Sequence, residues 1–449
     1  MSGEHSPKIV FVVPSAYLLG GVQVWLDYLL KGLNQHGFKC VCLAVDGQFH
    51  NAEHYFARYP FDHQIRVANP LGTHWGRVHS LTRALHKAQP DMVVVVNIPD
   101  AYTATHKVRQ SSGRNIKLVA AIHALEPDYF ADVIHQAKII DAVLVTNQLT
   151  ATAVVEFCKI ERERVYYAPY GVEVGVQRDH KVNESKPLKI LYSGRIEDDQ
   201  KRCSDLVDIA VELNKIGVDF ELKIAGDGPL KADLTVTFAQ STVANRVEFL
   251  GMVDRGVLLN EVIPTCDVLL ITSAWETGPI VAWEAMAAGL PVVSSRYIGL
   301  REENALLHQS NCLLFDVNDA PGAAKQLARL HDPSLVSSIV NSAHRLIRER
   351  YTQQASVACA AKVFTQILAA PPVSSRYKLV WTKYQKHGLP EKLFGARFGH
   401  YIRGLINRPA QSFSAGDEWP HTLGLNKMSV SAFTAKLLAL KSQAGDPVE

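Results

Sequence analysis

The sequence predicts an α/β protein with two doubly wound domains followed by a C-terminal extension. Short apolar runs alternate with stretches of helical periodicity through residues 8–168, and the same alternation starts again at residue 188. Strand, helix and strand in succession favour a parallel sheet covered by helices. The polar residues 182–187 separate the two series, and the composition changes after 371–372. We therefore expect four parts: a first domain over 1–168, a linker over 169–187, a second domain over 188–350 and a basic extension over 371–449.

The first domain is expected to open with a buried strand and an amphipathic helix. Residues 8–13 form a short apolar run, and apolar side chains then recur at helical spacing from Val22 to Leu33. Gly37 ends this helix, because glycine is the usual residue after a helix C-terminus. Further strands are expected at 39–45, 92–96, 117–122 and 142–146.

The second domain repeats this order of elements. Its strands are expected at 188–192, 221–225, 247–249, 268–272 and 291–294. Residues 342–368 form a long helical pattern that is broken near 351–352. We expect the part after the break, 351–370, to be a C-terminal helix that returns to the first domain.

The composition limits the classes of function. Apolar residues make up 47% of the chain and charged residues 20%, which supports a large core and excludes disorder. The net charge of +3 is too small to make nucleic acid the partner of the whole chain. The seven cysteines form no C-x-x-C pair, so no zinc or redox motif is indicated. Without an apolar signal segment or a run long enough for a membrane span, we expect a cytoplasmic protein.

The first candidate site follows the strand expected at 268–272. In open parallel sheets, ligands bind beyond the carboxyl ends of the strands. Pro279 suits the first turn of a helix, and the amides of Ile280 and Val281 would point out of its N-terminus, where phosphate can bind. Glu276 and Glu284 flank this helix start and can accept hydrogen bonds from sugar hydroxyls. Two such acids alone are also typical of an ordinary surface helix.

Cationic residues follow the first strand of the second domain. Arg195 offers bidentate contacts to phosphate and Lys201 a mobile charge, so together they could neutralise a diphosphate without a metal. Alone, such residues are more typical of a solvated loop. The Gly-Asp-Gly-Pro segment 226–229 indicates a turn after another strand. His123 follows the strand at 117–122, a position where a single histidine is usually structural.

Several motifs are absent from the sequence. No G-x-x-x-x-G-K-[ST] is present, so a P-loop is not indicated, and no G-x-G-x-x-G follows a strand. A nicotinamide- or flavin-dependent oxidoreductase is therefore not favoured. No two aspartates stand two positions apart, so the D-x-D motif that holds a metal against phosphate is missing. We accordingly predict no metal site and no cofactor.

The order and spacing of these motifs resemble the retaining GT-B glycosyltransferases of family four. The resemblance covers residues 8–370 and rests on these segments: 194–195 with Lys201, 226–229, 249–251, and Glu276 with Glu284 and the run up to Val293. Two looser matches are 20–21 and 168–172, the latter similar to the family's interdomain Pro-x-Gly-Val. Gly278 departs from the family, which usually has an apolar side chain there. Arg202 could share the role of Lys201.

The resemblance implies a GT-B fold, with two Rossmann-like domains facing a cleft. It also implies a role for each residue that matches the family's motifs near the reaction centre. Arg195 and Lys201 would bind the donor diphosphate, and the backbone amides of Ile280 and Val281 would cap it. Glu276 would hold hydroxyls of the transferred sugar near the reacting carbon.

The remaining matches would position the donor from its other sides. Glu284 would hold the ribose hydroxyls, and the backbone near Met252 and Val253 would meet the base. Gly20 and Gly21 would let the N-terminal domain approach the donor closely, and His123 would contact the sugar.

The resemblance also implies the reaction. It would be a metal-independent transfer, with retention, from a UDP- or GDP-linked sugar to a glycan or lipid-linked acceptor in polysaccharide or lipopolysaccharide synthesis. The family expectation is front-face attack, with the leaving phosphate taking the acceptor proton. Two alternatives remain: a sugar-nucleotide epimerase or phosphorylase on the same fold, and a non-catalytic sugar-nucleotide-binding protein.

The C-terminal extension carries a local positive charge. From Arg376 to Arg408 the sequence has eight Lys or Arg residues and one acid, Glu391. Five apolar residues between the basic positions fall on one helical face: Phe394, Phe398, Tyr401, Ile402 and Leu405. A basic amphipathic helix can lie on an anionic membrane surface, so we expect a peripheral position on the inner face of the cell membrane. The alternative is a solvated or domain-packed appendage, since three glycines weaken the helix.

Overall fold

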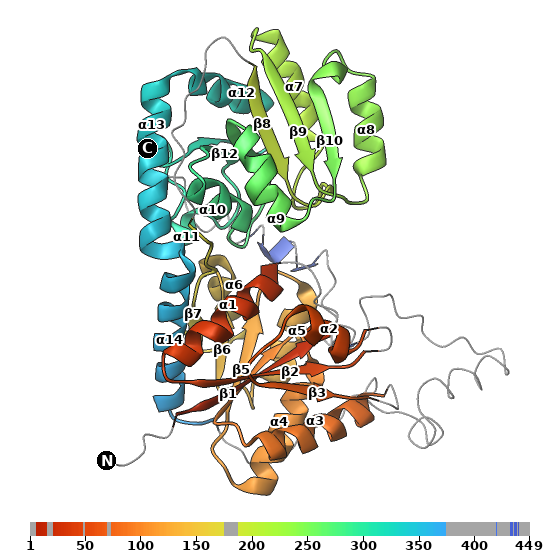
Figure 1. Ribbon diagram of the computed structural model, residues 1–449, viewed down its shortest axis with the longest axis vertical. Coiled ribbons are helices and arrows are strands. Elements are labelled where there is room, and N and C mark those ends of the chain that lie inside the picture. Colours follow the sequence, from red (N-terminus) through yellow and green to blue (C-terminus); the bar gives the residue numbers. More distant parts are fainter. Residues whose placement is uncertain are drawn as a thin grey trace, which may run out of the picture. The chain divides into compact units, whose positions relative to one another are not determined.

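The chain forms two compact units in the computed structural model, which describes residues 6–15, 21–47, 50–69, 73–174, 187–373 and single residues between 419 and 439. Unit 1 comprises Met1–Ala168 and Val357–Glu449, and unit 2 comprises Pro169–Ser356. Each unit holds one parallel sheet with helices on both of its faces (Figure 1). The predicted fold class, with two Rossmann-like sheets, is therefore confirmed.

Unit 1 is built on a seven-stranded sheet in the order β3-β2-β1-β4-β5-β6-β7. Its strands are β1 (Lys8–Pro14), β2 (Lys39–Val45), β3 (Gln64–Val67), β4 (Met92–Val96), β5 (Lys117–Ile122), β6 (Ala142–Val145) and β7 (Val165–Tyr167). The five strands predicted from apolar runs are all present. The two edge strands were not predicted, because β3 is four residues with mostly exposed side chains and β7 is three residues.

The helices of unit 1 bury one face each against this sheet. They are α1 (Gly21–Gln35), α2 (Ala52–Arg58), α3 (His74–Ala88), α4 (Pro99–Ser112), α5 (Pro127–Gln136), α6 (Gln148–Cys158) and the part of α14 (Gln353–Ala369) from Val357 onward. Phe11 in β1 is contacted edge-on by Trp25 of α1 and by Phe364 of α14, with ring centroids 6.2 and 6.0 Å apart. The part of α14 from Val357 onward thus contributes to the core of unit 1.

Unit 2 is built on a six-stranded sheet in the order β10-β9-β8-β11-β12-β13. Its strands are β8 (Leu188–Ser193), β9 (Phe220–Ala225), β10 (Val247–Gly251), β11 (Val268–Ile271), β12 (Val292–Ser295) and β13 (Leu313–Phe315). Strand order reverses between β8 and β11, the position where ligands bind in doubly wound sheets. All five predicted strands are present; the three-residue β13 was missed.

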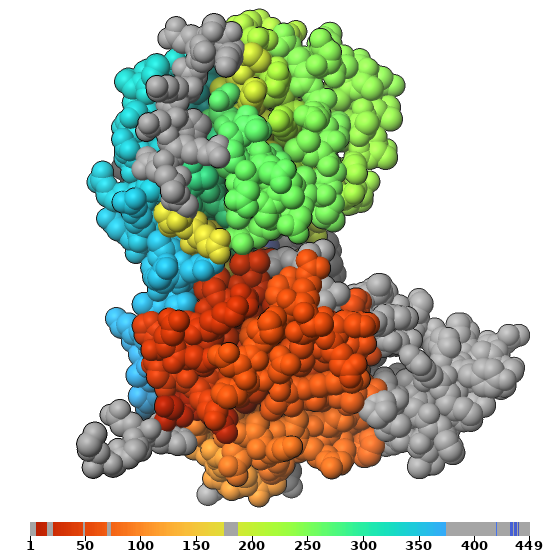
Figure 2. Space-filling view, in the orientation of Figure 1, coloured from red at the N-terminus to blue at the C-terminus, as the bar shows by residue number. Residues whose placement is uncertain are grey.

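The helices of unit 2 cover both faces of its sheet. They are α7 (Asp205–Lys215), α8 (Lys231–Ala239), α9 (Arg255–Val257), α10 (Ile280–Ala287), α11 (Leu300–Glu303), α12 (Ala320–Ala328) and α13 (Pro333–Leu346). In the space-filling view, the yellow and green region from β8 to β11 forms a closely packed surface (Figure 2). The predicted break in the long helix is confirmed, because a π-helical turn over Ile347–Tyr351 separates α13 from α14. No helix among the described residues is long and apolar enough to cross a bilayer.

The segment after Ala168 is bonded to the start of α14. The Val172 amide donates to Tyr351 O at 2.8 Å, and the Gln353 amide donates to Val172 O at 3.1 Å. Gly171 permits this close approach, because a Cβ there would lie 2.6 Å from Gln353 Cα. The glycine of the predicted Pro-x-Gly-Val segment therefore has a steric role, while residues 175–186 of the expected linker lie outside the described residues.

Candidate functional site

Three loops meet at the carboxyl ends of β8, β9 and β10. The Gly194 amide donates to Ala225 O at 3.0 Å, and the Gly226 amide donates to Gly251 O at 2.8 Å. A Cβ on Gly226 would lie 1.8 Å from Gly194 O, and one on Gly228 would lie 2.2 Å from Ile196 O. Glycines at these positions let the three backbones touch. The Gly-Asp-Gly-Pro segment is thus the packing element that holds the other two loops.

Lys201 and Glu276 form an ion pair at this edge of the sheet. Lys201 Nζ lies 2.6 Å from Glu276 Oε1, and Ser273 Oγ donates to the same oxygen at 2.5 Å. The Glu276 side chain is 5% exposed, so this carboxylate is largely removed from water. The sequence places the two residues 75 positions apart, and the fold brings them together.

The loop that carries Lys201 is fixed by two residues that the sequence did not single out. The Glu197 carboxylate accepts hydrogen bonds from the amides of Lys201 and Gln200, at 3.0 and 3.1 Å. Gln200 Nε2 donates to Trp275 O at 3.2 Å and, more weakly, to Glu276 at 3.4 Å. These contacts join the loop after β8 to the loop after β11. No sequence motif marked Glu197 or Gln200, because their role depends on the turn between them.

Arg195 and Arg202 differ sharply in their surroundings. Arg195 is exposed, its guanidinium reaches only Gln200 Oε1 at 3.5 Å, and its carbonyl accepts a hydrogen bond from the buried Tyr192 hydroxyl at 2.9 Å. Arg202 instead forks onto both oxygens of Asp205 at 2.8 Å and also donates to Asn318. Arg195 therefore presents a solvent-accessible cation at the sheet edge. Arg202 is engaged by α7, which favours Lys201 over Arg202 for the shared role.

The N-terminus of α10 lies directly after Glu276 in the chain. The amides of Ala282 and Trp283 both donate to Pro279 O, at 2.8 and 3.3 Å, so Ile280 and Val281 supply the first two amides of the helix. The helix begins one residue later than the proline-in-the-first-turn expectation, because Pro279 is its N-cap. Gly278 adopts a φ of +81°, a left-handed conformation that suits glycine. The predicted departure from the family at this position thus has a backbone reason.

Glu284 lies one to two turns inside α10 and is also buried, at 6% exposure. Its Oε1 accepts a hydrogen bond from Arg255 Nε at 2.7 Å. Burial raises the pKa of Glu284, the positive charge of Arg255 opposes this rise, and the nearby Glu173 adds to it. Arg255 therefore offsets part of the rise in the pKa of Glu284 that burial causes. Nothing in the sequence marks Arg255 beyond its position three residues after Met252.

The segment expected to meet a base runs between β10 and α9. Met252 is 77% exposed, an unusual state for a large apolar side chain. Val253 is half-buried and packs against the core of unit 2. The apolar Met252 side chain and the backbone beside it are thus available to a flat ligand at this edge.

The candidate site residues of unit 1 that the structure describes, His123 and Gly21, differ in burial. His123 follows β5 and is buried with its ring edge-on to Trp25, at 4.4 Å between centroids. Burial lowers the pKa of His123 to about 3, so its imidazole is neutral near pH 7. Gly21 is the exposed first residue of α1, and Gly20 lies outside the described residues.

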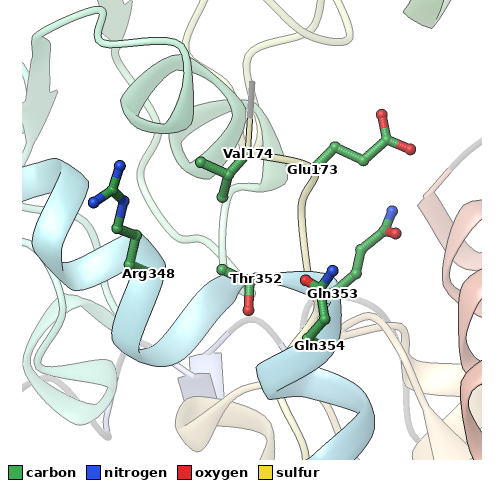
Figure 3. A pocket seen from close by; sticks show the side chains of 6 residues that line it. All are labelled: Glu173, Val174, Arg348, Thr352, Gln353 and Gln354. Carbon is green, nitrogen blue, oxygen red and sulfur yellow. The ribbon is translucent and has the colours of Figure 1, made fainter. Parts of the chain in front are cut away.

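A polar cavity of about 350 Å³ lies elsewhere in unit 2, at the start of α14. It is lined by Glu173, Val174, Arg348, Thr352, Gln353 and Gln354, and Figure 3 shows Glu173 and Arg348 extending in opposite directions. None of the predicted site residues lines it. Glu173 connects it electrostatically to Glu284, whose pKa it raises.

The two parallel Rossmann-like sheets, with cations, carboxylates and a helix N-terminus at the carboxyl edge of the second, are typical of the GT-B fold. Residues 187–332 match the family described as "Glycosyl transferases group 1", and residues 19–175 match "Glycosyltransferase Family 4". The chain belongs to this group of glycosyltransferase enzymes.

Named relatives agree with this assignment. The glycosyltransferase EpsF of Bacillus subtilis is 31% identical over 145 residues, which are 30% of this chain and 37% of EpsF. The lipopolysaccharide 1,6-galactosyltransferase of Salmonella typhimurium is 26% identical over 227 residues, 49% of this chain and 59% of that protein. The chain thus spans between about a third and three fifths of these curated relatives.

The fold has a close match among solved structures. Anabaena Alr3699/HepE, whose structure contains UDP-glucose, superposes with a TM-score of 0.64 at 18% identity. The match covers 80% of this chain and 99% of that protein. At this identity the likeness shows the shared fold.

Proposed function

We propose that the chain transfers a sugar from a nucleotide-sugar donor to an acceptor, with retention of configuration and without a metal. The observation that carries this proposal is the cluster of Lys201, Glu276 and the α10 N-terminus at the switch point of the unit 2 sheet. Lys201 Nζ and Glu276 Oε1 lie 2.6 Å apart, and α10, whose first two amides are those of Ile280 and Val281, begins four residues after Glu276 in the chain. A leaving diphosphate needs positive charge, and Arg195, Lys201 and the helix amides supply it.

The two buried carboxylates divide the donor between them in this proposal. Glu276 accepts hydrogen bonds from the transferred sugar, and Glu284 accepts them from the ribose. When the donor binds, the ion pair between Lys201 and Glu276 separates. Lys201 then contacts the donor phosphate, and Glu276 accepts hydrogen bonds from the sugar hydroxyls. Arg255 opposes the protonation of Glu284 that burial favours, and the backbone near Met252 and Val253 meets the base.

For unit 1, the family resemblance supports two proposed roles: Gly20 and Gly21 would let the backbone approach a donor, and His123 would contact a sugar hydroxyl as a neutral imidazole. A neutral ring suits a hydrogen bond to a hydroxyl, because one of its nitrogens donates and the other accepts.

The acceptor we propose is a glycan or a lipid-linked glycan in cell-surface polysaccharide or lipopolysaccharide synthesis. The named galactosyltransferase relative supports this acceptor class. The chain would then work in the cytoplasm and at the inner face of the cell membrane, in part through 376–408, a stretch that lies outside the described residues.

A donor screen followed by product analysis tests the proposal. Binding stabilises the folded state by mass action, so the true donor among UDP-, GDP- and ADP-sugars should raise the melting temperature most. Glu284→Ala should abolish the rise. With that donor and a glycan acceptor, we expect a lengthened glycan and free nucleoside diphosphate, at a rate that excess EDTA leaves intact. Formation of an epimer or a sugar phosphate, or loss of turnover in EDTA, would overturn the assignment.

A further inference from the structure

Helix α3 carries no acidic residue. Its fifteen residues, His74–Ala88, include Arg77, Arg83 and Lys87 as well as three histidines. It lies beside α4, on one face of the unit 1 sheet (Figure 1). Helix α3 is therefore rich in basic residues. The outer surface of its neighbour α4 has no exposed acidic side chain to offset them.

The inner face of α3 explains why the helix is present. Val78, Leu81 and Leu85 are fully buried. At the N-terminal end, His74 and Arg77 both pair with the buried Asp100 of α4. These contacts hold the inner face of α3 in place. On the outer side, His86 Nε2 lies 2.9 Å from Ser111 Oγ of α4.

The outer face of α3 consists of Trp75, His79, Arg83, His86 and Lys87, all exposed. They are three or four residues apart and so lie along one stripe of the helix. Trp75 is 42% exposed and stacks on His79, with ring centroids 5.6 Å apart and planes at 12°. The stripe therefore begins with a supported aromatic platform and continues with two permanent cations.

We propose that the outer face of α3 docks on an anionic lipid bilayer. Tryptophan favours the boundary between headgroups and acyl chains, because its ring is apolar and its N–H is polar. Lys and Arg beside it are attracted to the negative surface of acidic phospholipids. The absence of Asp and Glu from α3 completes the charge complementarity. This surface is independent of sugar transfer, so it stands or falls separately from the proposed reaction.

Vesicle sedimentation with the full chain tests the docking. We expect the chain to pellet with vesicles that contain phosphatidylglycerol, to stay in solution with phosphatidylcholine alone, and to be released by about 0.5 M salt. The double variant Arg83→Glu with Lys87→Glu should bind the acidic vesicles at least about tenfold more weakly. The matched control is Lys325→Glu with Arg345→Glu, which reverses two exposed charges in unit 2 and should bind as the unchanged chain does.

Quenching by brominated lipids tests the aromatic part. Brominated acidic vesicles should quench a component of the tryptophan fluorescence that disappears in Trp75→Phe, although five other tryptophans remain. Melting temperatures of the variants show that they fold. Equal binding by the unchanged chain and Arg83→Glu/Lys87→Glu would assign all membrane affinity to other segments, including 376–408, and overturn the proposal. Equal quenching of the unchanged chain and of Trp75→Phe would also overturn the proposal. The same holds if Arg83→Glu/Lys87→Glu reduces only self-association of the chain and leaves vesicle binding unchanged.

Discussion

A buried carboxylate such as that of Glu276 is costly to remove from water unless it has hydrogen-bonded or charged partners. Lys201 and Ser273 supply two short contacts to its Oε1, which offset the cost of removing it from water. Deleting Lys201 therefore leaves an uncompensated charge as well as removing a phosphate ligand. A change in rate after substitution of Lys201 can come from the uncompensated charge or from the lost phosphate ligand. A substitution at a neighbouring residue is therefore needed as a control.

The neighbouring residues Lys201 and Arg202 provide such a control. Lys201→Ala should lower kcat on the order of 10²-fold, as expected for the loss of one charge-stabilising donor in the transition state. Arg202→Ala should leave kcat nearly unchanged and reduce the melting temperature, because its guanidinium is held by Asp205 and Asn318. Steady-state kinetics of both variants, with the identified donor, make the comparison. A larger loss of kcat in Arg202→Ala would show that the two roles are exchanged.

The two glutamates should separate kinetically. Glu276→Ala should mainly lower kcat, because its proposed contacts strengthen as the sugar develops charge. Glu284→Ala should mainly raise KM for the donor, because ribose contacts are the same in the ground state and the transition state. Initial rates over a range of donor concentrations distinguish the two outcomes. Indistinguishable kcat and KM values would reject this division of labour while leaving the location of the site intact.

The pair of Arg255 and Glu284 predicts a pH dependence. Burial raises the pKa of Glu284 and Arg255 lowers it. As the pH falls through that raised pKa, Glu284 takes up a proton and accepts hydrogen bonds less well, so KM for the donor should rise. In Arg255→Ala the rise should begin at a higher pH, and KM near neutrality should increase about tenfold. The control is Arg246→Ala, which removes an exposed pair with Asp219 and should leave the profile unchanged.

Single residues differ in how far the sequence reveals them. Lys201, Glu276 and Glu284 stand in a recognisable order, so their place at one sheet edge could be predicted. Arg255 could not, because it acts on a carboxylate 29 residues away and its own surroundings form no motif. Neither the spacing nor the charge distinguished Lys201 from Arg202; only the orientation of the loop after β8 does so.

At the scale of elements, the loops after β8, β9 and β10 depend on backbone contact. Gly226 has a φ of +149°, and its hypothetical Cβ lies 1.8 Å from Gly194 O, a carbonyl that cannot move without shifting Arg195. The three loops therefore behave as one packed unit. Strand ends of this kind could be placed from apolar runs, whereas the three- and four-residue strands β13, β7 and β3 could not, since they bury too few side chains to form a pattern.

Gly226→Ala should destabilise this unit and weaken donor binding. The overlap with Gly194 O adds to the strain of a positive φ, and we expect a loss of at least about 2 kcal/mol in the free energy of unfolding. Gly217→Ala is the matched control: its φ is +78°, and nothing lies within 4 Å of the added Cβ. It should cost about 1 kcal/mol from backbone strain alone. Denaturant unfolding of both variants measures the difference, and equal losses would mean that the steric contact is relieved by a small loop movement.

At the scale of the whole molecule, the extension after residue 371 is partly packed. Trp419, Phe433 and Leu437 are buried, and Phe433 contacts the rings of Phe130 in α5 and Phe157 in α6, with centroids 5.0 and 5.6 Å away. The Val373 amide also donates to Asp141 at 2.8 Å. These residues follow the domain-packed alternative for the extension. Phe433 and Leu437 stand four residues apart in the apolar run 430–440, a helical spacing that the interpretation of the extension did not use.

Membrane attachment through 376–408 must therefore be tested in the full-length chain. A chain cut near Ala370 would lose Phe433 as well as the basic stretch, and removing a buried phenylalanine costs about 3–5 kcal/mol. Reversing Arg397 and Arg403 to Glu keeps the packed residues and removes part of the cluster of eight cations. We expect binding to acidic vesicles to fall severalfold, and to fall further when Arg83→Glu and Lys87→Glu are added, because charges that contact the membrane independently contribute nearly additively. Unchanged sedimentation of the Arg397→Glu/Arg403→Glu chain at low salt would show that the basic stretch does not contact the membrane.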